Sequence, residues 1–236
     1  MSKIEVAHAA TVAGRSPLAI ILPERVSIAE CIGPHKGDLF SEELALVKHA
    51  LPQRRQEFAA GRTCARIALR RLGLANQPIL VGSNRQPIWP STVAGSITHC
   101  SGYCAAAVAW KAEIVSLGID AELNDTLPKG VIREVATESE VECLSRGFEI
   151  EYGGMAIALD CLIFSAKEAL YKAWFPVMQS WLDFKDVNLY FEPRSCTFHF
   201  EFVDRSKGAM FKNFSGYGRF GLFDKYILTS VILVRH

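Results

Sequence analysis

Apolar residues repeat at helical spacing over two long stretches of the chain. Residues 52–73 predict one helix that ends at Gly73, and residues 155–175 predict a second, with Pro176 just past its end. The apolar residues on one side of the first helix are Phe58, Ala65, Ala68, Leu69 and Leu72. Thr137, followed three residues later by Glu140, forms a capping-box pattern that predicts a shorter helix through Leu144.

Short apolar runs that suit strands follow each predicted helix. They cover residues 95–99, 103–110, 115–121, 187–191, 196–203 and 226–234. A helix followed by a meander of strands, repeated once, predicts an α+β fold of two halves. We place the halves at residues 1–113 and 114–236, and expect short strands and loops over the first 45 residues. The alternation in Thr197 to Phe202 predicts one aromatic face packed in a core.

Composition narrows the class of protein. Half of the 236 residues are hydrophobic and 22% are charged, which supports a sizeable core and excludes wholesale disorder. Lys and Arg number 26 against 25 Asp and Glu, so a globally basic nucleic-acid binder is not expected. No apolar run approaches the ~20 residues of a membrane span. Seven scattered cysteines and the lack of a secretory signal predict a cytoplasmic protein with free thiols.

The segment Gly118-Ile-Asp-Ala-Glu122 carries two carboxylates at alternate positions. On a strand, Asp120 and Glu122 point to the same side. Neighbouring carboxylates favour a cation between them, and oxygen ligands suit Mg²⁺, which is often shared with substrate phosphates. On spacing alone, a solvated acidic strand end is the simpler interpretation.

The second predicted helix carries Glu168 and Lys172, one turn apart on the same face. An ordinary ion pair explains such spacing. Because the surrounding residues 162–175 are mostly apolar, a charged pair on this helix favours a functional site over a solvated face.

Two further segments offer groups that bind phosphate. Six arginines lie within residues 54–71, and at 100° per residue Arg55, Arg62 and Arg66 fall within about 40° of one another. The planar guanidinium suits a phosphate clamp, although a solvated basic face is the alternative. Residues 85–90 read Arg-Gln-Pro-Ile-Trp-Pro, and Gly95-Ser-Ile-Thr-His-Cys100 places His99 after the hydroxyls of Ser96 and Thr98, where it is able to donate to a phosphate.

These four segments together resemble the Sfp-type 4′-phosphopantetheinyl transferases. The family motifs G-I-D-x-E, [WF]-S-x-K-E-x-x-x-K, G-S-x-[ST]-H-C and E-F-x-x-G-R occur in family order and spacing over residues 50 to 175, and residues 85–90 match the enterobactin-type and actinobacterial subgroup. Phe164 replaces the Trp of many members, and Ala121 replaces Ile or Val. The resemblance implies two α+β halves related by a pseudo-twofold axis, with coenzyme A bound between them.

The resemblance also implies a reaction: transfer of the 4′-phosphopantetheine arm from coenzyme A to a serine of an apo acyl or peptidyl carrier protein, releasing adenosine 3′,5′-bisphosphate. Mg²⁺, or Mn²⁺ in its place, is then held by Asp120, Glu122 and Glu168. Glu168 is the candidate base for the carrier serine, and Lys172 binds the reacting phosphate. The residues implied in coenzyme A binding are Arg54 or Arg55, Arg62, Arg85, Ser96, Thr98, His99, Lys167 and Lys172. Helical phase favours Arg55, whereas the family's arginine spacing favours Arg54.

Two other functions use some of the same residues. A Mg²⁺-dependent coenzyme A pyrophosphatase uses the same carboxylates with water as the nucleophile. A non-catalytic carrier-protein binder lacks the catalytic residues, but Asp120, Glu168 and Lys172 are all present. The expected partners are coenzyme A and fatty-acid, polyketide or nonribosomal-peptide carrier domains, with no nucleic acid or membrane, and the chain is expected to be a monomer.

Overall fold

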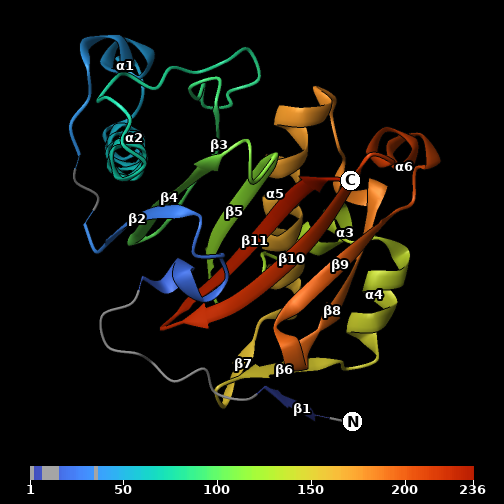
Figure 1. Ribbon diagram of the computed structural model, residues 1–236. Helices are drawn as coiled ribbons and strands as arrows, with labels where there is room; N and C mark the ends of the chain where they lie inside the picture. Colours follow the sequence, from blue (N-terminus) through green and yellow to red (C-terminus); the bar gives the residue numbers. More distant parts are fainter. Residues whose placement is uncertain (1–2, 7–15, 35–36) are drawn as a thin grey trace.

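The computed structural model describes residues 3–6, 16–34 and 37–236 (Figure 1). The helices are α1 (Ser41–Leu46), α2 (Pro52–Arg71), α3 (Val131–Val135), α4 (Glu138–Ser145), α5 (Leu159–Met178) and α6 (Arg205–Phe211). The strands are β1 (Lys3–Val6), β2 (Ser27–Ile32), β3 (Val93–Cys100), β4 (Tyr103–Trp110), β5 (Ser116–Leu123), β6 (Glu149–Tyr152), β7 (Met155–Ile157), β8 (Val187–Glu192), β9 (Thr197–Phe202), β10 (Phe214–Phe223) and β11 (Tyr226–Arg235). These elements confirm the α+β class.

The first half packs α2 against an antiparallel sheet of order β2-β4-β3. The inward side of α2 carries small and apolar residues, so the helix lies close to the strands. Its buried members are Ala60, Cys64, Ala65, Ala68 and Leu69, which share a core with Ile79, Val93, Ala106 and Val108. The helix predicted over residues 52–73 is therefore confirmed.

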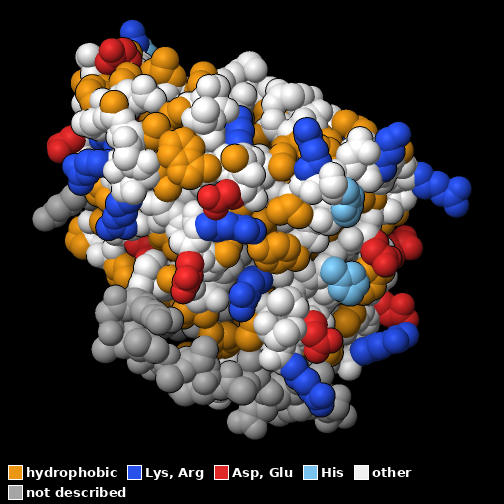
Figure 2. Space-filling view, in the orientation of Figure 1, with side chains coloured by type: hydrophobic (Ala, Val, Ile, Leu, Met, Phe, Trp, Pro, Cys, Tyr) orange, Lys and Arg blue, Asp and Glu red, His pale blue; other side chains and the backbone are white. Residues whose placement is uncertain are grey.

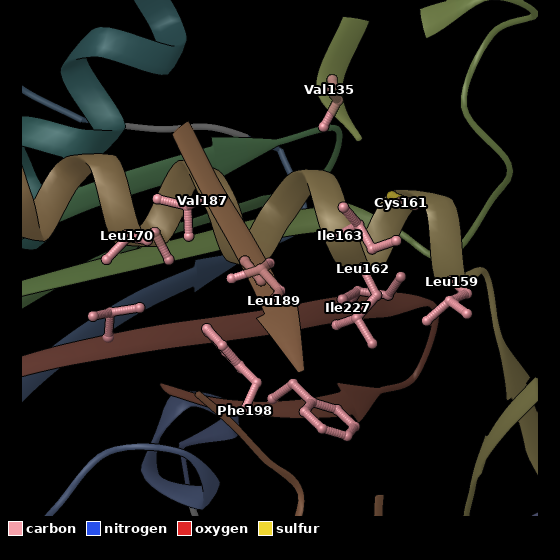
Figure 3. Packing of buried hydrophobic residues seen from close by; sticks show 14 of the residues in the cluster. Val135, Leu159, Cys161, Leu162, Ile163, Leu170, Val187, Leu189, Phe198 and Ile227 are labelled. Atoms are coloured by element: carbon pink, nitrogen blue, oxygen red, sulfur yellow. The ribbon is translucent and has the colours of Figure 1, made fainter. Parts of the chain in front are cut away.

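The second half packs α5 against an antiparallel sheet of order β5-β11-β10-β9-β8. Figure 3 shows Leu162 and Leu170 of α5 in the same core as Leu189 of β8 and Ile227 of β11. The closest approach is at Gly118 on β5, where a Cβ atom would lie 1.9 Å from the Ala169 carbonyl oxygen. A glycine is required here because a helix and a strand meet backbone to backbone. A small third sheet, β1-β6-β7, pairs β1 with β6 in parallel.

Side chains join the two larger sheets where β3 meets β5. The Ser96 hydroxyl accepts a hydrogen bond from the Ile119 amide at 3.1 Å, and the Thr98 hydroxyl accepts one from the Ala121 amide at 3.1 Å. All four residues are buried. This junction brings the Gly95–Cys100 motif beside the Gly118–Glu122 motif.

Several local predictions are confirmed. Thr137 caps α4, since its hydroxyl accepts from the Glu140 amide while the Glu140 carboxylate accepts from the Thr137 amide at 2.8 Å. The strands predicted at 103–110 and 226–234 appear as β4 and β11, and the aromatic side of β9 packs inward through Phe198.

Other elements differ from the prediction. Residues 155–157 form strand β7, so the long helix begins at Leu159, and it continues through Pro176 to Met178. Proline is tolerated there because its missing N–H removes only one hydrogen bond in the last turn. Helix α1 stands where loops were expected, and its inward residue is the carboxylate Glu43, which breaks the apolar pattern. The expectation of strands and loops over the first 45 residues also covers residues 1–2, 7–15 and 35–36, which lie outside the described residues.

Strand β10 was missed because glycines interrupt its apolar pattern. Cβ atoms at Gly216 and Gly218 would lie 2.7 Å and 2.2 Å from the rings of Phe200 and Phe198. The glycines leave space for these β9 rings to lie over the neighbouring strand, a packing that alternation rules do not recognise.

The visible surface is mixed in charge. Figure 2 shows positive and negative side chains interspersed with apolar ones on that face, in keeping with the net charge of +1. No helix in the described ranges has the length and apolar character needed to cross a bilayer.

Candidate active site

A cavity of about 520 Å³ opens between α2, the segment 81–89, β3 and α5. This volume is in the range of cofactor pockets. Its walls combine aromatic and apolar side chains with five basic groups. The basic residues are Arg54, Arg62, Arg85, His99 and Lys172. Two carboxylates, Glu57 and Glu168, also line it. The cavity therefore suits a large ligand that carries several negative charges.

Lys172 links the cavity wall to Asp120. The Lys172 Nζ donates to Asp120 Oδ1 at 2.6 Å and to the Ile119 carbonyl at 3.2 Å. Thr98 Oγ1 also donates to Asp120 Oδ1, at 3.1 Å. Asp120 is 4% exposed, and its Oδ2 is a buried oxygen without a hydrogen-bond partner among the described residues. An orphaned anionic oxygen is costly to bury unless a cation or a donor completes it.

Glu122 and Glu168 extend the negative cluster around Asp120. Burial, together with the charges of Asp120 and Glu168, raises the pKa of Glu122 to about 7, although Lys172 opposes the rise. Burial and the Asp120 charge also raise the pKa of Glu168, again against Lys172. For Lys172 burial favours the neutral amine, but the Asp120 and Glu168 carboxylates outweigh it and raise the pKa. The strand geometry that places Asp120 beside Glu122 is thus as predicted.

These carboxylates fit a divalent cation by their chemistry. The unpartnered Asp120 oxygen and the raised pKa values of its neighbours are both relieved by a bound cation. Within residues 3–6, 16–34 and 37–236, however, no three His, Cys, Asp or Glu side chains converge as a ready-made metal site. A cation here would need ligands besides protein, which is usual for Mg²⁺.

The structure separates the two arginines between which the sequence left a choice. Arg54 lines the cavity, and its Nη1 donates to His99 Nε2 at 2.6 Å. Arg55 faces a different surface hollow beside Asp38 and Leu44. Helical phase grouped Arg55 with Arg62, but phase alone does not show which side β3 occupies, and His99 of β3 lies on the side of Arg54.

Arg62 is both a cavity residue and a structural one. It is 5% exposed, its Nε donates to the Ile79 carbonyl at 2.8 Å, and its guanidinium lies 4.3 Å from the centre of the Phe58 ring. Burial lowers the pKa of Arg62 to about 10, with partial compensation from Glu43. Arg85 stands at the turn that follows Gly82, with φ of 66°, on the facing wall.

Comparisons with known proteins agree on one family. Residues 42–109 match the model of the 4′-phosphopantetheinyl transferase N-terminal domain, and residues 116–228 match that of the 4′-phosphopantetheinyl transferase superfamily. The 4′-phosphopantetheinyl transferase Npt of Nocardia iowensis is 38% identical over 89% of this chain and 97% of its own length. The chain belongs to the 4′-phosphopantetheinyl transferase superfamily.

Two further relatives are 4′-phosphopantetheinyl transferases by name. PptT of Mycobacterium tuberculosis is 42% identical over 70% of each chain, and Svp of Streptomyces mobaraensis is 47% identical over 68% of this chain. The match spans 64% of the Streptomyces protein. The enzyme class predicted from the four motifs is confirmed by these relatives.

Two residues that the superfamily resemblance implies in coenzyme A binding, Thr98 and Lys167, do not line the main cavity. Thr98 is 2% exposed, and its hydroxyl donates to Asp120 and accepts from the Ala121 amide. Ser96, which is also buried, does line the cavity. Lys167 points to the far side of α5, where its Nζ donates to Glu140 at 2.6 Å and to the carbonyls of Val135 and Phe184. The Lys167 ammonium thus serves the packing of α5 and lies outside the main cavity.

Sequence reasoning overlooked three groups that line the cavity of this superfamily member. They are Glu57, Trp89 and Tyr171. Each lies inside a motif that was quoted for other residues. Glu57 could have been predicted from the sequence, because it is the glutamate of the E-F-x-x-G-R motif and lies one helical turn before Gly61.

Proposed function

We propose that the chain transfers the 4′-phosphopantetheine arm of coenzyme A to a serine hydroxyl of an apo acyl or peptidyl carrier protein, with Mg²⁺ as the metal. The observation that carries this proposal is the Asp120–Lys172 pair, with its orphaned Asp120 oxygen, beside a cavity lined by basic groups. In the reaction the serine oxygen forms a bond to the phosphorus that bears the pantetheine arm. The bridging P–O bond of the pyrophosphate breaks, and adenosine 3′,5′-bisphosphate leaves.

Coenzyme A binding is assigned to the basic wall. Arg54 and His99 are in contact and are suited to the 3′-phosphate, and Arg85 and Lys172, which line the same cavity, are the proposed pyrophosphate-binding residues. Ser96 contributes a hydroxyl from β3. Arg55 and Lys167 are left out of this assignment, because neither lines the cavity.

Asp120, Glu122 and Glu168 are the residues that would hold Mg²⁺, directly or through bound water, because among the described residues no three such side chains converge as a ready-made site. The bound metal supplies Lewis-acid neutralisation of the pyrophosphate oxygens. Lys172 holds Asp120 and stands at the cavity wall, so its ammonium stabilises charge on the reacting phosphate.

Glu168 is the proposed base that takes the serine proton. It lines the cavity one helical turn before Lys172. A carboxylate at this wall is within the same cavity as the reacting phosphate, so it is placed to accept the proton of a hydroxyl that enters the cavity.

The remaining expectations concern the setting of the reaction. That the chain is a cytoplasmic monomer and serves polyketide, nonribosomal-peptide or fatty-acid carriers stays a prediction. The free thiols of all seven cysteines favour a reducing compartment.

The test is intact-protein mass spectrometry of an apo carrier incubated with the chain, coenzyme A and Mg²⁺. We expect the carrier to gain one phosphopantetheine arm, and EDTA to prevent the gain. A carrier whose acceptor serine is changed to alanine is the control. Hydrolysis of coenzyme A without carrier modification would instead identify a pyrophosphatase, and intact coenzyme A with carrier binding would identify a non-catalytic binder.

A further inference from the structure

The cavity contains a carboxylate that the proposed reaction does not use. Glu57 lines the wall from α2, and its side chain is 17% exposed. Its Oε2 lies 3.4 Å from Arg54 Nη1 and 3.9 Å from His99 Nδ1, and its Oε1 accepts from Gln53 at 3.1 Å. A negative charge beside the groups proposed to bind a phosphate repels that ligand, so its presence needs a reason.

The hydrogen bond with Arg54 indicates which nitrogen of the His99 ring carries the proton. Arg54 can only donate, so His99 Nε2 is the acceptor of the 2.6 Å contact between them. In a neutral ring the proton is then on Nδ1, the nitrogen that faces Glu57. At 3.9 Å the Glu57 carboxylate is beyond hydrogen-bond distance of Nδ1, so it acts on the Nδ1–H of His99 through its charge.

Glu57 is built to remain ionised in this position. Partial burial opposes its charge, but the hydrogen bonds from Gln53 and Arg54, together with the Arg54 charge, hold the pKa of Glu57 below its ordinary value. Arg54 is 54% exposed along its side chain and has many rotamers, so Glu57 and His99 are the contacts that hold it at the cavity wall.

A phosphate that enters between Arg54 and His99 changes this arrangement. Its oxygens accept from the Arg54 guanidinium and from an Nε2–H of His99. The ring offers that proton as the neutral Nε2–H tautomer or as the imidazolium, and the Glu57 carboxylate near Nδ1 favours the imidazolium. Glu57 then faces the Nδ1–H of that cation and balances its charge. A ligand without a terminal phosphate makes neither the Arg54 nor the His99 interaction.

We propose that Glu57 is a positioning residue that gives the cavity its preference for a ligand with a terminal phosphomonoester, by holding Arg54 and His99 as a pair. This inference rests on the proposed function, since it takes the 3′-phosphate of coenzyme A as that group. Glu57 itself touches neither the reacting phosphorus nor the serine.

The test compares the affinity for coenzyme A with that for dephospho-coenzyme A, by calorimetry without a carrier protein. We expect the wild type to favour coenzyme A and Glu57→Gln to reduce that preference on the order of tenfold, mainly through weaker coenzyme A binding. Glu42→Gln is the matched control, because it removes one exposed carboxylate that hydrogen-bonds Ser41 outside the cavity. In a His99→Ala background, Glu57→Gln should have no further effect on the preference.

Three results would overturn the inference: an unchanged preference in Glu57→Gln, an equal loss of affinity for both ligands, or no preference in the wild type. Failure of carrier modification is a separate result. It counts against the proposed transferase reaction, while a preference that depends on Glu57 still supports the role of this carboxylate.

Discussion

Lys172 of α5 and Asp120 of β5 are joined by a 2.6 Å hydrogen-bonded ion pair that connects the long helix of the second half to the strand beside the first-half sheet. Only the Lys172 side chain of this pair retains substantial exposure, 27% against 5% for Asp120. Lys172 therefore lines the cavity, and the buried Asp120 carboxylate holds its ammonium in place through the hydrogen bond. The Asp120 oxygen that remains unpartnered is the atom on which the metal proposal depends.

Asp120→Asn should abolish transfer while the fold persists. The amide keeps the shape of the carboxylate but removes the charge that holds Lys172 and that would ligate the metal. We expect the transfer rate to fall on the order of a hundredfold or more. Rates by carrier mass spectrometry, with circular dichroism as the check on folding, measure the two effects separately. Near-native transfer by the folded variant would contradict the metal assignment.

Lys167→Met should damage stability and spare coenzyme A binding. Lys167 and Glu140 form a buried pair, with exposures of 2% and 5%, and the change leaves the Glu140 carboxylate without its cation. Breaking such a pair costs about 3–5 kcal/mol. Urea unfolding gives the loss of stability, and calorimetry below the transition gives the affinity. A selective loss of coenzyme A affinity at unchanged stability would show that Lys167 takes part in coenzyme A binding.

Gly118→Ala should impair both stability and transfer. Its Cβ would lie 1.9 Å from the Ala169 carbonyl oxygen and 2.8 Å from the Ala173 amide nitrogen, which are backbone atoms that cannot rotate away. The strand and helix must separate, which moves Asp120 away from Lys172. Gly208→Ala in α6 is the matched control, because its Cβ meets nothing closer than 3.8 Å and alanine favours the helix. If Gly118→Ala behaved like this control in unfolding and transfer assays, the close packing of β5 on α5 would be wrong.

Tyr103→Phe should alter the stability of the protein in a pH-dependent way. Tyr103 is fully buried, and its hydroxyl donates to Glu30, so phenylalanine should cost about 1–3 kcal/mol at neutral pH. Burial and the Glu30 charge raise the pKa of Tyr103 above its ordinary value. The unfolded tyrosine ionises first as the pH rises past about 10, so the unfolded state then binds fewer protons and the wild type loses stability.

Phenylalanine has no such proton, so the stability gap between wild type and Tyr103→Phe should narrow above about pH 10. Urea unfolding of both proteins at neutral pH and at alkaline pH measures the gap. A constant gap across this window would mean that the tyrosine ionises equally readily in the folded and unfolded states.

Most long elements could be predicted because each carries its signal locally. Helix α2 shows a one-sided apolar period, and Thr137 with Glu140 forms a capping box. Strand β4 is a continuous apolar run, and β11 is apolar except for Thr229, Ser230 and the terminal Arg235. Strand β10 and helix α1 escaped prediction because glycines and a carboxylate interrupt their apolar patterns at positions that contact other elements. The glycines of β10 suit the Phe198 and Phe200 rings of β9, and Glu43 of α1 pairs with Arg66 of α2.

The sequence by itself determined the α+β class, the family and the chemical identity of the site, because the four motifs contain the carboxylates, the lysine, the histidine and the arginines. Only the tertiary structure decided which of these groups face one cavity. It turned Arg54 inward and Arg55 outward, gave Lys167 to the Glu140 carboxylate, and added Glu57 beside His99. The physical reason is that helical phase and strand alternation fix only directions around an element's own axis. Which direction meets a cavity depends on the packing of α2 and α5 against strands from other parts of the chain.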